Sequence, residues 1–156
     1  MDISQAGIDL LKEFEGFRSH PYNDIAGNST IGFGTLLHKG PVNFTTNELD
    51  KQYISGISVD EGEQLLRAHL SVEVVPYLYA LVKVPLTQGQ FDSLCCFMYN
   101  IGEGAFRSST LLRKLNMGQY DAVPSELMKW VFAGGAPSNG LRNRRIKEGQ
   151  LWSSTT

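Results

Sequence analysis

One stretch of β-favouring and turn-forming residues interrupts a chain whose remaining pattern is helical. From residue 17 to about residue 37, β-favouring residues such as Tyr22, Thr30 and Phe33 stand between glycines, asparagines and aspartates. This composition predicts short strands joined by tight turns, and residues 24–28 have the composition of one such turn. A chain with one small sheet among many helices belongs to the α+β class.

Helical patterns lie on both sides of this stretch. Ser4 is placed to cap a first helix that carries its apolar residues on one face. The capping-box spacings at residues 45–48 and 58–61 predict a short helix and a long one, and we expect Pro76 to break the long helix. Thr87 begins the most apolar helix, which we expect to form the core of a larger lobe. Shorter helices are predicted near residues 109–116, 120–130 and 141–152.

Length and composition describe one globular domain. The chain has 156 residues, of which 42% are hydrophobic and 19% charged, and it contains neither internal repeats nor a long linker. We expect a single domain over residues 1–156, with a β-rich lobe at about 16–57 and a helical lobe at about 58–156 that includes the N-terminal helix. No apolar run approaches the roughly 20 residues that span a bilayer, and the first five residues lack the pattern of a signal peptide.

Charge and cysteine content argue against several classes of function. The net charge of −2 is uneven, because residues 1–102 carry a balance of −6 and residues 103–156 a balance of +4. The basic part could face an anionic polymer, or the charges simply keep the surface solvated. No basic stripe alternates with aromatic residues, so we expect no nucleic-acid partner. Cys95 and Cys96 are adjacent, which disfavours a disulfide, and we expect two buried free thiols.

Two carboxylates and a hydroxyl stand in contrasting local settings. Glu15 ends the first amphipathic helix between Phe14 and Phe17, while Asp24 lies in the polar turn that precedes Thr30. Glycoside hydrolysis needs one carboxylic acid that stays protonated, which apolar surroundings promote, and one carboxylate that stays ionised in a polar site. Glu15 fits the acid, Asp24 fits the base, and the Thr30 hydroxyl could hold the attacking water. The spacing alone also fits a solvated pair of charges, so it does not decide.

The pattern Glu-x8-Asp-x5-Thr formed by Glu15, Asp24 and Thr30 resembles the catalytic signature of the phage-type lysozymes, glycoside hydrolase family 24. The flanking residues 12–16 and 30–34 are also similar to that family. Further segments resemble family sequences in the family's order along nearly the whole chain: residues 40–51 and 58–61, which are similar to the T-even phage branch, and residues 84–94, 99–102 and 140–148.

The resemblance implies a lysozyme-like α+β fold, with an active-site cleft between a small β lobe and a larger helical lobe of a single catalytic domain. It implies an endolysin that hydrolyses the β-1,4 bond between N-acetylmuramic acid and N-acetylglucosamine in peptidoglycan and so lyses the host cell. Glu15 would be the general acid, and Asp24 and Thr30 would activate and position water. Inversion at the anomeric carbon would need a carboxyl separation of roughly 6.5–9.5 Å. No metal or organic cofactor is implied.

The resemblance also marks residues around the three central ones. The positions that contact saccharide in the family correspond to Gly34, Leu36, Tyr99 and Thr110. Plain packing is an equal alternative for Leu36 and Tyr99. An arginine of the C-terminal run pairs with the catalytic glutamate in this family, and Arg142 is the first candidate for that role and Arg145 the second.

One departure from the family pattern concerns histidine. Many members place a histidine directly after the stretch that ends at Gly34, where this chain has Thr35, and His38 follows in another register. The contact made by that histidine is therefore not implied here. His20, His38 and His69 lack metal-ligand spacing, so no metal site is expected.

Two alternatives to a hydrolase remain open at this point. A lytic transglycosylase needs no activated water, so the presence of Asp24 and Thr30 disfavours it. A wall-binding protein without activity is disfavoured by the intact set of three residues. The resemblance further implies a monomer that binds peptidoglycan, without a nucleic-acid partner or stable membrane association. By analogy with the family, it would accumulate in the host cytoplasm and reach the wall after holin-dependent release.

Overall fold

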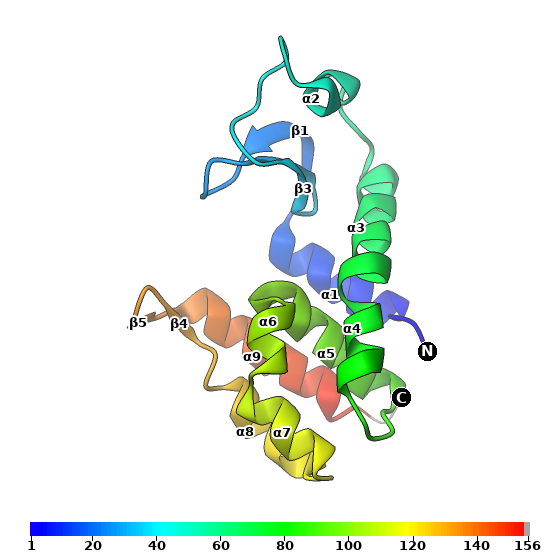
Figure 1. The fold of residues 1–156 in the computed structure, drawn as a ribbon, viewed down its shortest axis with the longest axis vertical. Helices are drawn as coiled ribbons and strands as arrows, with labels where there is room; N and C mark the ends of the chain where they lie inside the picture. The colour runs from blue at the N-terminus through cyan, green and yellow to red at the C-terminus, as the bar shows by residue number, and fades with distance from the viewer. Residues whose placement is uncertain (155–156) are drawn as a thin grey trace. The chain divides into compact units, whose positions relative to one another are not determined.

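The computed structural model describes residues 1–154, and Figure 1 shows their elements. Helices dominate and the largest sheet has three strands, which confirms the predicted α+β class. In this part of the chain, none of the helices is both long and apolar enough to cross a bilayer. The elements are α1 (Gln5–Glu15), β1 (Arg18–Asn23), β2 (Ser29–Gly32), β3 (Thr35–His38), α2 (Glu48–Gln52), α3 (Val59–Glu73), α4 (Val75–Leu81), α5 (Gln88–Ile101), α6 (Glu103–Arg107), α7 (Thr110–Asn116), the 3-10 helix η1 (Tyr120–Ala122), α8 (Val123–Leu127), β4 (Phe132–Ala133), β5 (Ala136–Pro137) and α9 (Asn139–Trp152).

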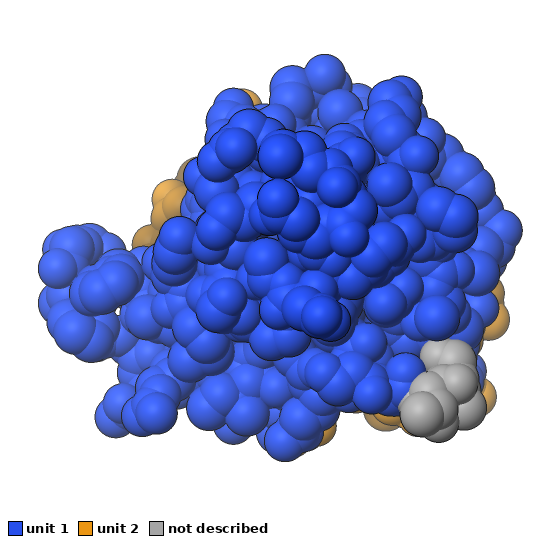
Figure 2. All heavy atoms as spheres, turned by 90° about the horizontal axis from the view of Figure 1, so that it is seen from below, with its two compact units in different colours: residues 1–7, 70–156 blue, residues 8–69 orange. Residues whose placement is uncertain are grey.

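The chain divides into two compact units, which Figure 2 colours separately. Unit 1 contains residues 1–7 and 70–156, and unit 2 contains residues 8–69. The divisions fall inside α1 and α3, so each of these helices contributes residues to both units.

Unit 2 is built on an antiparallel sheet with the strand order β1-β2-β3. All four residues of β2 are buried, whereas β1 and β3 are partly exposed. Because a central strand pairs on both sides, β2 forms the interior of the sheet and the other two strands form its edges. Helix α2 packs against β3 and covers that edge.

Helix α2 begins later than the capping-box spacing predicted. Its N-cap is Asn47 and not Thr45, because the Asn47 side-chain oxygen accepts hydrogen bonds from the N–H groups of Leu49 and Asp50 at 3.0 and 3.1 Å. The Thr45 N–H instead donates to the side-chain oxygen of Asn43 at 2.9 Å. The side-chain oxygens of Asn43 and Asn47 therefore accept the backbone N–H groups at the start of α2, and the Thr45 hydroxyl does not cap the helix.

The predicted helix starts at Ser58 and Thr87 are confirmed. Ser58 and Glu61 exchange reciprocal hydrogen bonds of 3.0 and 3.1 Å at the start of α3. Pro76 lies in the first turn of α4, where a proline is tolerated, and α3 ends just before it. Thr87 and Gln90 form the capping box that begins α5.

Helix α5 supplies the core of unit 1. Every residue from 91 to 98 is buried, including the adjacent Cys95 and Cys96, which are free thiols as predicted. Burial raises the pKa of both thiols well above the ordinary value, so both remain protonated and unreactive. Helix α9 packs along α5, and α8 packs against α9.

A β-hairpin and the short helix α6 were not predicted. Strands β4 and β5 pair through Phe132 with Pro137 and Ala133 with Ala136. Gly134 and Gly135 join them at φ values of 58° and 81°, the left-handed conformation that a two-residue hairpin turn requires. Figures 1 and 2 both show this hairpin projecting from the rest of unit 1. Strands of two residues are too short to produce an alternating pattern, so only the Gly-Gly pair indicated them.

The core role of α5 predicts a large effect of shortening Leu94, whose side chain is fully buried. Leu94→Ala should lower the free energy of unfolding by about 2–5 kcal/mol, because lost burial and a residual cavity both contribute. Guanidinium denaturation measures this directly. Met117→Ala, at a position that is 62% exposed, is the control and should change the free energy by less than about 0.5 kcal/mol. Equal effects of the two substitutions would contradict this assignment of the core.

Candidate active site

Glu15 is the last residue of α1 and lies at the point where the chain turns toward the sheet. The helix ends here because Gly16 adopts a left-handed φ of 67°, and its N–H donates to the Lys12 carbonyl at 3.1 Å. Phe14, Glu15 and Phe17 are each partly buried. Glu15 therefore ends the helix as a partly buried carboxyl residue, with Phe14 and Phe17 close to it in the sequence.

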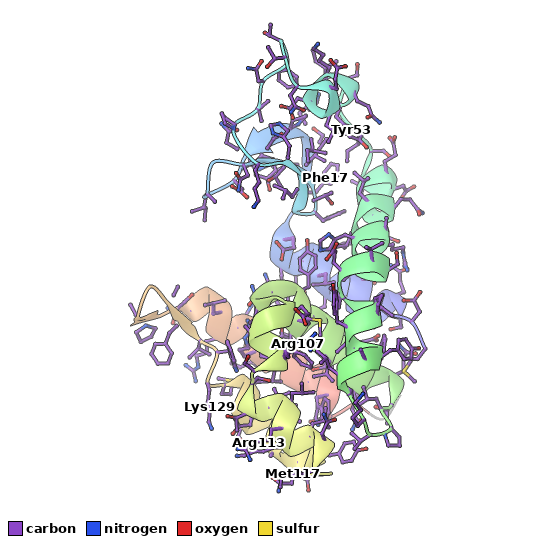
Figure 3. All side chains as sticks on the ribbon, viewed as in Figure 1. Phe17, Tyr53, Arg107, Arg113, Met117 and Lys129 are labelled. Carbon is purple, nitrogen blue, oxygen red and sulfur yellow. The ribbon has the colours of Figure 1, made fainter. Side chains whose placement is uncertain are left out.

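Phe17, labelled in Figure 3, ties this helix end to the remainder of unit 2. Its ring packs on Phe33 with a centroid distance of 5.2 Å. A Cβ atom on Gly62 of α3 would lie only 2.9 Å from the Phe17 ring, so glycine is needed for this close approach. Lys12 adds a second link, because its ammonium donates to Glu63 of α3 at 2.8 Å. The position of Glu15 relative to the sheet is thus set by both apolar packing and an ion pair.

Asp24 opens the turn between β1 and β2. Its backbone N–H donates to the Asn28 carbonyl at 2.9 Å, and its own carbonyl accepts from the Gly27 N–H at 2.9 Å. One carboxylate oxygen, Oδ1, accepts from the Asn28 N–H at 2.9 Å. Asp24 is partly exposed, and all of these partners are polar backbone groups. The predicted polar setting of Asp24 is therefore present.

Thr30 lies in the centre of the sheet, on β2, and is 3% exposed. Its hydroxyl donates to the Asn28 carbonyl at 3.0 Å. Across the sheet Thr30 pairs with Tyr22 of β1 and with Leu36 of β3. Side chains of directly paired residues project to the same face, so these three residues form one row across the sheet.

Tyr22 connects the two carboxylates electrostatically. Burial raises the pKa of the Tyr22 phenol above its ordinary value, and the negative charges of Glu15 and Asp24 raise it further, while Arg18 lowers it. The Arg18 guanidinium lies 4.6 Å from the centre of the Tyr22 ring. Both carboxylates therefore influence the same phenol, and all three residues belong to unit 2.

Tyr22 was not among the site residues predicted from the sequence. A signal was present, since Tyr22 stands two residues before Asp24 in an extended segment, and such residues point to the same face. A pocket in the structure is lined by Arg18, Tyr22, Asn23 and Asp24, together with the turn residues Ile25 and Ala26. This pocket gives a ligand direct access to the Asp24 side of the site.

The four predicted saccharide-contacting residues fall in both units. Gly34 and Leu36 belong to unit 2, where Leu36 shares the row with Thr30 and is 50% exposed. That exposure favours a contact role for Leu36 over plain packing. Tyr99 on α5 is partly buried, and Thr110 is exposed at the start of α7, both in unit 1. Their part in substrate binding stays a prediction.

The two candidate arginines have very different surroundings in unit 1. Arg145 is 1% exposed, and its guanidinium donates to Glu148, to the Asn100 side chain and to the Trp130 carbonyl, the last at 2.9 Å. Burial raises the pKa of Glu148 to about 7, although Arg145 lies beside it. Arg142, in contrast, is exposed in the first turn of α9. Arg145 is thus occupied within unit 1, whereas the Arg142 side chain lies at the surface.

Thr35 stands at the position where many members of the family have a histidine. The Thr35 hydroxyl oxygen is buried, and within residues 1–154 it has no hydrogen-bond partner. His38 instead contacts Asp50, a fully buried residue of α2, through Nε2 at 2.7 Å. Asp50 also accepts from the Ser29 hydroxyl at 2.5 Å and from the Asn43 N–H at 2.7 Å. We refer to Ser29, His38, Asn43 and Asp50 as the Asp50 cluster, which the sequence analysis did not identify.

The Asp50 cluster alters the protonation of two of its members. Burial pushes the pKa of Asp50 upward, but hydrogen bonds from Ser29, Asn43 and His38 outweigh burial and hold the pKa below its ordinary value. The hydrogen bond to Asp50 and that to the Lys39 carbonyl raise the pKa of His38. No group of three or more His, Cys, Asp or Glu side chains in residues 1–154 is arranged to hold a metal ion.

Known proteins resemble this chain over its whole length. The sequence model of the family described as phage lysozyme matches residues 12–148. The chain is 42% identical to the endolysin of Bacillus phage B103, over 97% of this chain but only 54% of that protein, so it spans about half the length of that relative. It is 38% identical to the endolysin of Acyrthosiphon pisum secondary endosymbiont phage 1, over 99% of both chains. A mutant of P22 lysozyme matches in structure with a TM-score of 0.81 at 34% identity, over 99% of both chains, which confirms the lysozyme-like fold.

The Asp50 cluster predicts how stability depends on pH. The pKa of His38 is higher in the folded state than in the unfolded state, where it is about 6.5. The stability that His38 contributes is therefore complete below about pH 6.5 and is lost as pH rises through the folded-state pKa. The lowered pKa of Asp50 means that its contribution is present above about pH 4 and is lost in more acidic solution.

His38→Gln isolates the histidine contribution. The unfolding free energy of the wild type, measured by guanidinium denaturation from pH 5 to 9, should fall relative to that of His38→Gln as pH rises above about 6.5. Parallel curves for the two proteins over this range would show that His38 does not gain stability by holding its proton.

Proposed function

The chain belongs to the phage lysozyme family, and from this premise we propose that it is an endolysin that hydrolyses peptidoglycan. The bond cleaved is the β-1,4 linkage between N-acetylmuramic acid and N-acetylglucosamine, and its cleavage lyses the host cell. The observation that carries this proposal is that Asp24 and Thr30 both bond to Asn28, while Glu15, the third residue of the family pattern, ends α1 in the same unit.

Glu15 serves as the general acid. We assign it this role because it ends α1 between Phe14 and Phe17 in the sequence and is partly buried. In the reaction this proton passes to the glycosidic oxygen as the bond from that oxygen to the anomeric carbon breaks. The leaving sugar therefore departs as a neutral alcohol.

Asp24 and Thr30 activate water on the opposite side of the bond. The Thr30 hydroxyl donates its hydrogen to the Asn28 carbonyl, so its lone pairs can accept one hydrogen of the attacking water. Because Asp24 Oδ1 accepts from the Asn28 N–H, we assign its other oxygen, Oδ2, to accept the second hydrogen. The water oxygen then directs a lone pair at the anomeric carbon, and its proton passes to Asp24.

This arrangement leads to inversion at the anomeric carbon. Water attacks from the face opposite the leaving oxygen, and a carboxyl separation of roughly 6.5–9.5 Å would leave room for that water. Gly34, Leu36, Tyr99 and Thr110 contact the saccharide, and Leu36 is the best placed of them because it shares the sheet row with Thr30. Of the two candidate arginines for the family's glutamate-pairing role, Arg142 is the stronger, since Arg145 is occupied by Glu148, Asn100 and Trp130.

The cellular setting is part of the same proposal. The enzyme acts as a monomer on peptidoglycan, with neither a nucleic-acid partner nor a stable association with the membrane. It accumulates in the host cytoplasm and acts on the wall after holin-dependent release. The reaction as written uses acid, base and water, so it requires neither a metal ion nor an organic cofactor.

Substitution of the two carboxylates tests the proposed roles. Glu15→Gln and Asp24→Asn should each slow the clearing of a peptidoglycan suspension by about 10²–10⁴-fold, because each removes one proton-transfer group. Glu48→Gln changes the same kind of group on α2, where the side chain is 87% exposed, and should leave the rate unchanged. Equal clearing by wild type, Glu15→Gln and Asp24→Asn would contradict the assignment.

Product analysis separates hydrolysis from transglycosylation. Mass spectrometry of digested peptidoglycan should show muropeptides that have gained one water molecule per bond cleaved. Products carrying a 1,6-anhydro ring would lack that water and would replace the hydrolase by a lytic transglycosylase.

A further inference from the structure

Asn28 contacts both residues of the proposed water-activating pair. Its N–H donates to Asp24 Oδ1 at 2.9 Å, and its carbonyl accepts from the Thr30 hydroxyl at 3.0 Å and from the Asp24 N–H at 2.9 Å. One peptide segment therefore sets the orientation of the Asp24 carboxylate and of the Thr30 hydroxyl together. Any displacement of Asn28 moves both groups.

Asn28 is in turn fixed to the loop that follows β3. Its side-chain oxygen accepts from the Gly40 N–H at 2.9 Å. The N–H of the next residue, Ser29, donates to the Gly40 carbonyl at 2.8 Å. Gly40 has a left-handed φ of 98°, which favours glycine. These two hydrogen bonds tie the position of Asn28 to that of Gly40.

The Asp50 cluster holds both sides of this connection. The Asp50 carboxylate accepts from Ser29, directly after Asn28, and from His38, two residues before Gly40. Ser29 and His38 are also paired across β2 and β3. The third donor, the Asn43 N–H, belongs to the loop beyond Gly40. A fully buried carboxylate thus anchors the segments on either side of the Asn28–Gly40 contact.

His38 completes the anchor from the outer side of the cluster. Its Nε2 lies 2.7 Å from Asp50 Oδ2, and its Nδ1 lies 2.9 Å from the Lys39 carbonyl oxygen. Both nitrogens face acceptors, and only the imidazolium ion carries a hydrogen on each nitrogen. The protonated ring therefore holds the backbone next to Gly40 while it holds Asp50. A neutral ring satisfies only one of the two contacts.

We propose that Asp50 and His38 are positioning residues for hydrolysis, which set the geometry of Asp24 and Thr30 through Ser29, Gly40 and Asn28. The proposal rests on the proposed function, since it assigns water activation to Asp24 and Thr30. Neither residue contacts the reacting atoms, and both act through the backbone that carries the pair. Asp50 and His38 therefore affect the rate of the chemical step more than they affect substrate binding, because misplacement of a reacting group by about 1 Å costs up to about 10²-fold in rate.

The test measures kcat and KM on soluble, uncrosslinked glycan strands for wild type, His38→Ala, His38→Gln and Asp50→Asn, well below the unfolding temperature of each. His38→Ala should lower kcat by about tenfold with KM changed less than about twofold. His38→Gln, whose amide can still donate to Asp50, should recover most of this loss. Lys51→Ala, at the exposed neighbour of Asp50 on α2, is the control and should match wild type.

The pH profile supplies a readout that a purely structural role would not change. The kcat of wild type should fall relative to that of His38→Gln as pH rises through the titration of His38, since the neutral ring releases either Asp50 or Lys39. Amide hydrogen exchange at Asn28 and Gly40 should also be faster in His38→Ala. If Asp50→Asn does not fold, the two His38 variants still decide the outcome.

Three results would overturn the proposal: an unchanged kcat in folded His38→Ala, a loss confined to KM, or a loss that His38→Gln leaves uncorrected at every pH. Failure of the proposed function gives a different result. In that case Glu15→Gln keeps the activity of the wild type, whereas failure of the positioning role alone leaves Glu15→Gln inactive and His38→Ala fully active.

Discussion

The hydrogen bonds around Asn28 are the interaction on which the proposed chemistry depends. They join a turn residue, Asp24, to a strand residue, Thr30, although the two differ in burial and in backbone conformation. A turn is ordinarily the more mobile of the two kinds of segment. Here the turn takes its geometry from the buried strand, because the same peptide group is bonded to both. The base and the hydroxyl that orient water can therefore be held as one unit.

Glu15 depends on a separate set of contacts. Phe17 packs on Phe33, and Lys12 pairs with Glu63, so the end of α1 is fixed against β2 and α3 by interactions that do not involve Asn28. Glu15, the proposed acid, and Asp24, the proposed base, thus have separate supports, which suits the proposed inverting mechanism. Such a mechanism needs the two carboxyl groups far enough apart to admit water and held in different environments.

Helix starts and turns that are set by neighbouring residues in the sequence were predicted well. Capping boxes at Ser58 and Thr87 lie where the helices begin, and the turn after Asp24 forms through its own backbone bonds. The short helix predicted after residues 45–48 is present as α2, but its cap is Asn47 and not Thr45. The choice of cap depends on the bonds of Asn43, which are set by the folded loop. The β4–β5 hairpin was missed because its strands are only two residues long.

The candidate site was predictable only in part, and for a physical reason. Glu15, Asp24 and Thr30 were proposed from a family pattern in one short stretch of chain, and in the structure Asp24 and Thr30 both bond to Asn28. The Asp50 cluster joins residues 29, 38, 43 and 50, whose separations follow no helical or strand period. A polar residue such as Asp50 looks like a solvated helix position until its burial is known. Contacts that depend on tertiary packing leave no local signature.

The stereochemistry of the first product tests the central claim most directly. Proton NMR during cleavage of soluble glycan strands distinguishes the two anomers of the new reducing end before they equilibrate. If Glu15 donates a proton while Asp24 and Thr30 direct water to the opposite face, the α anomer appears first. Initial appearance of the β anomer, or of a 1,6-anhydro sugar, would contradict this division of roles.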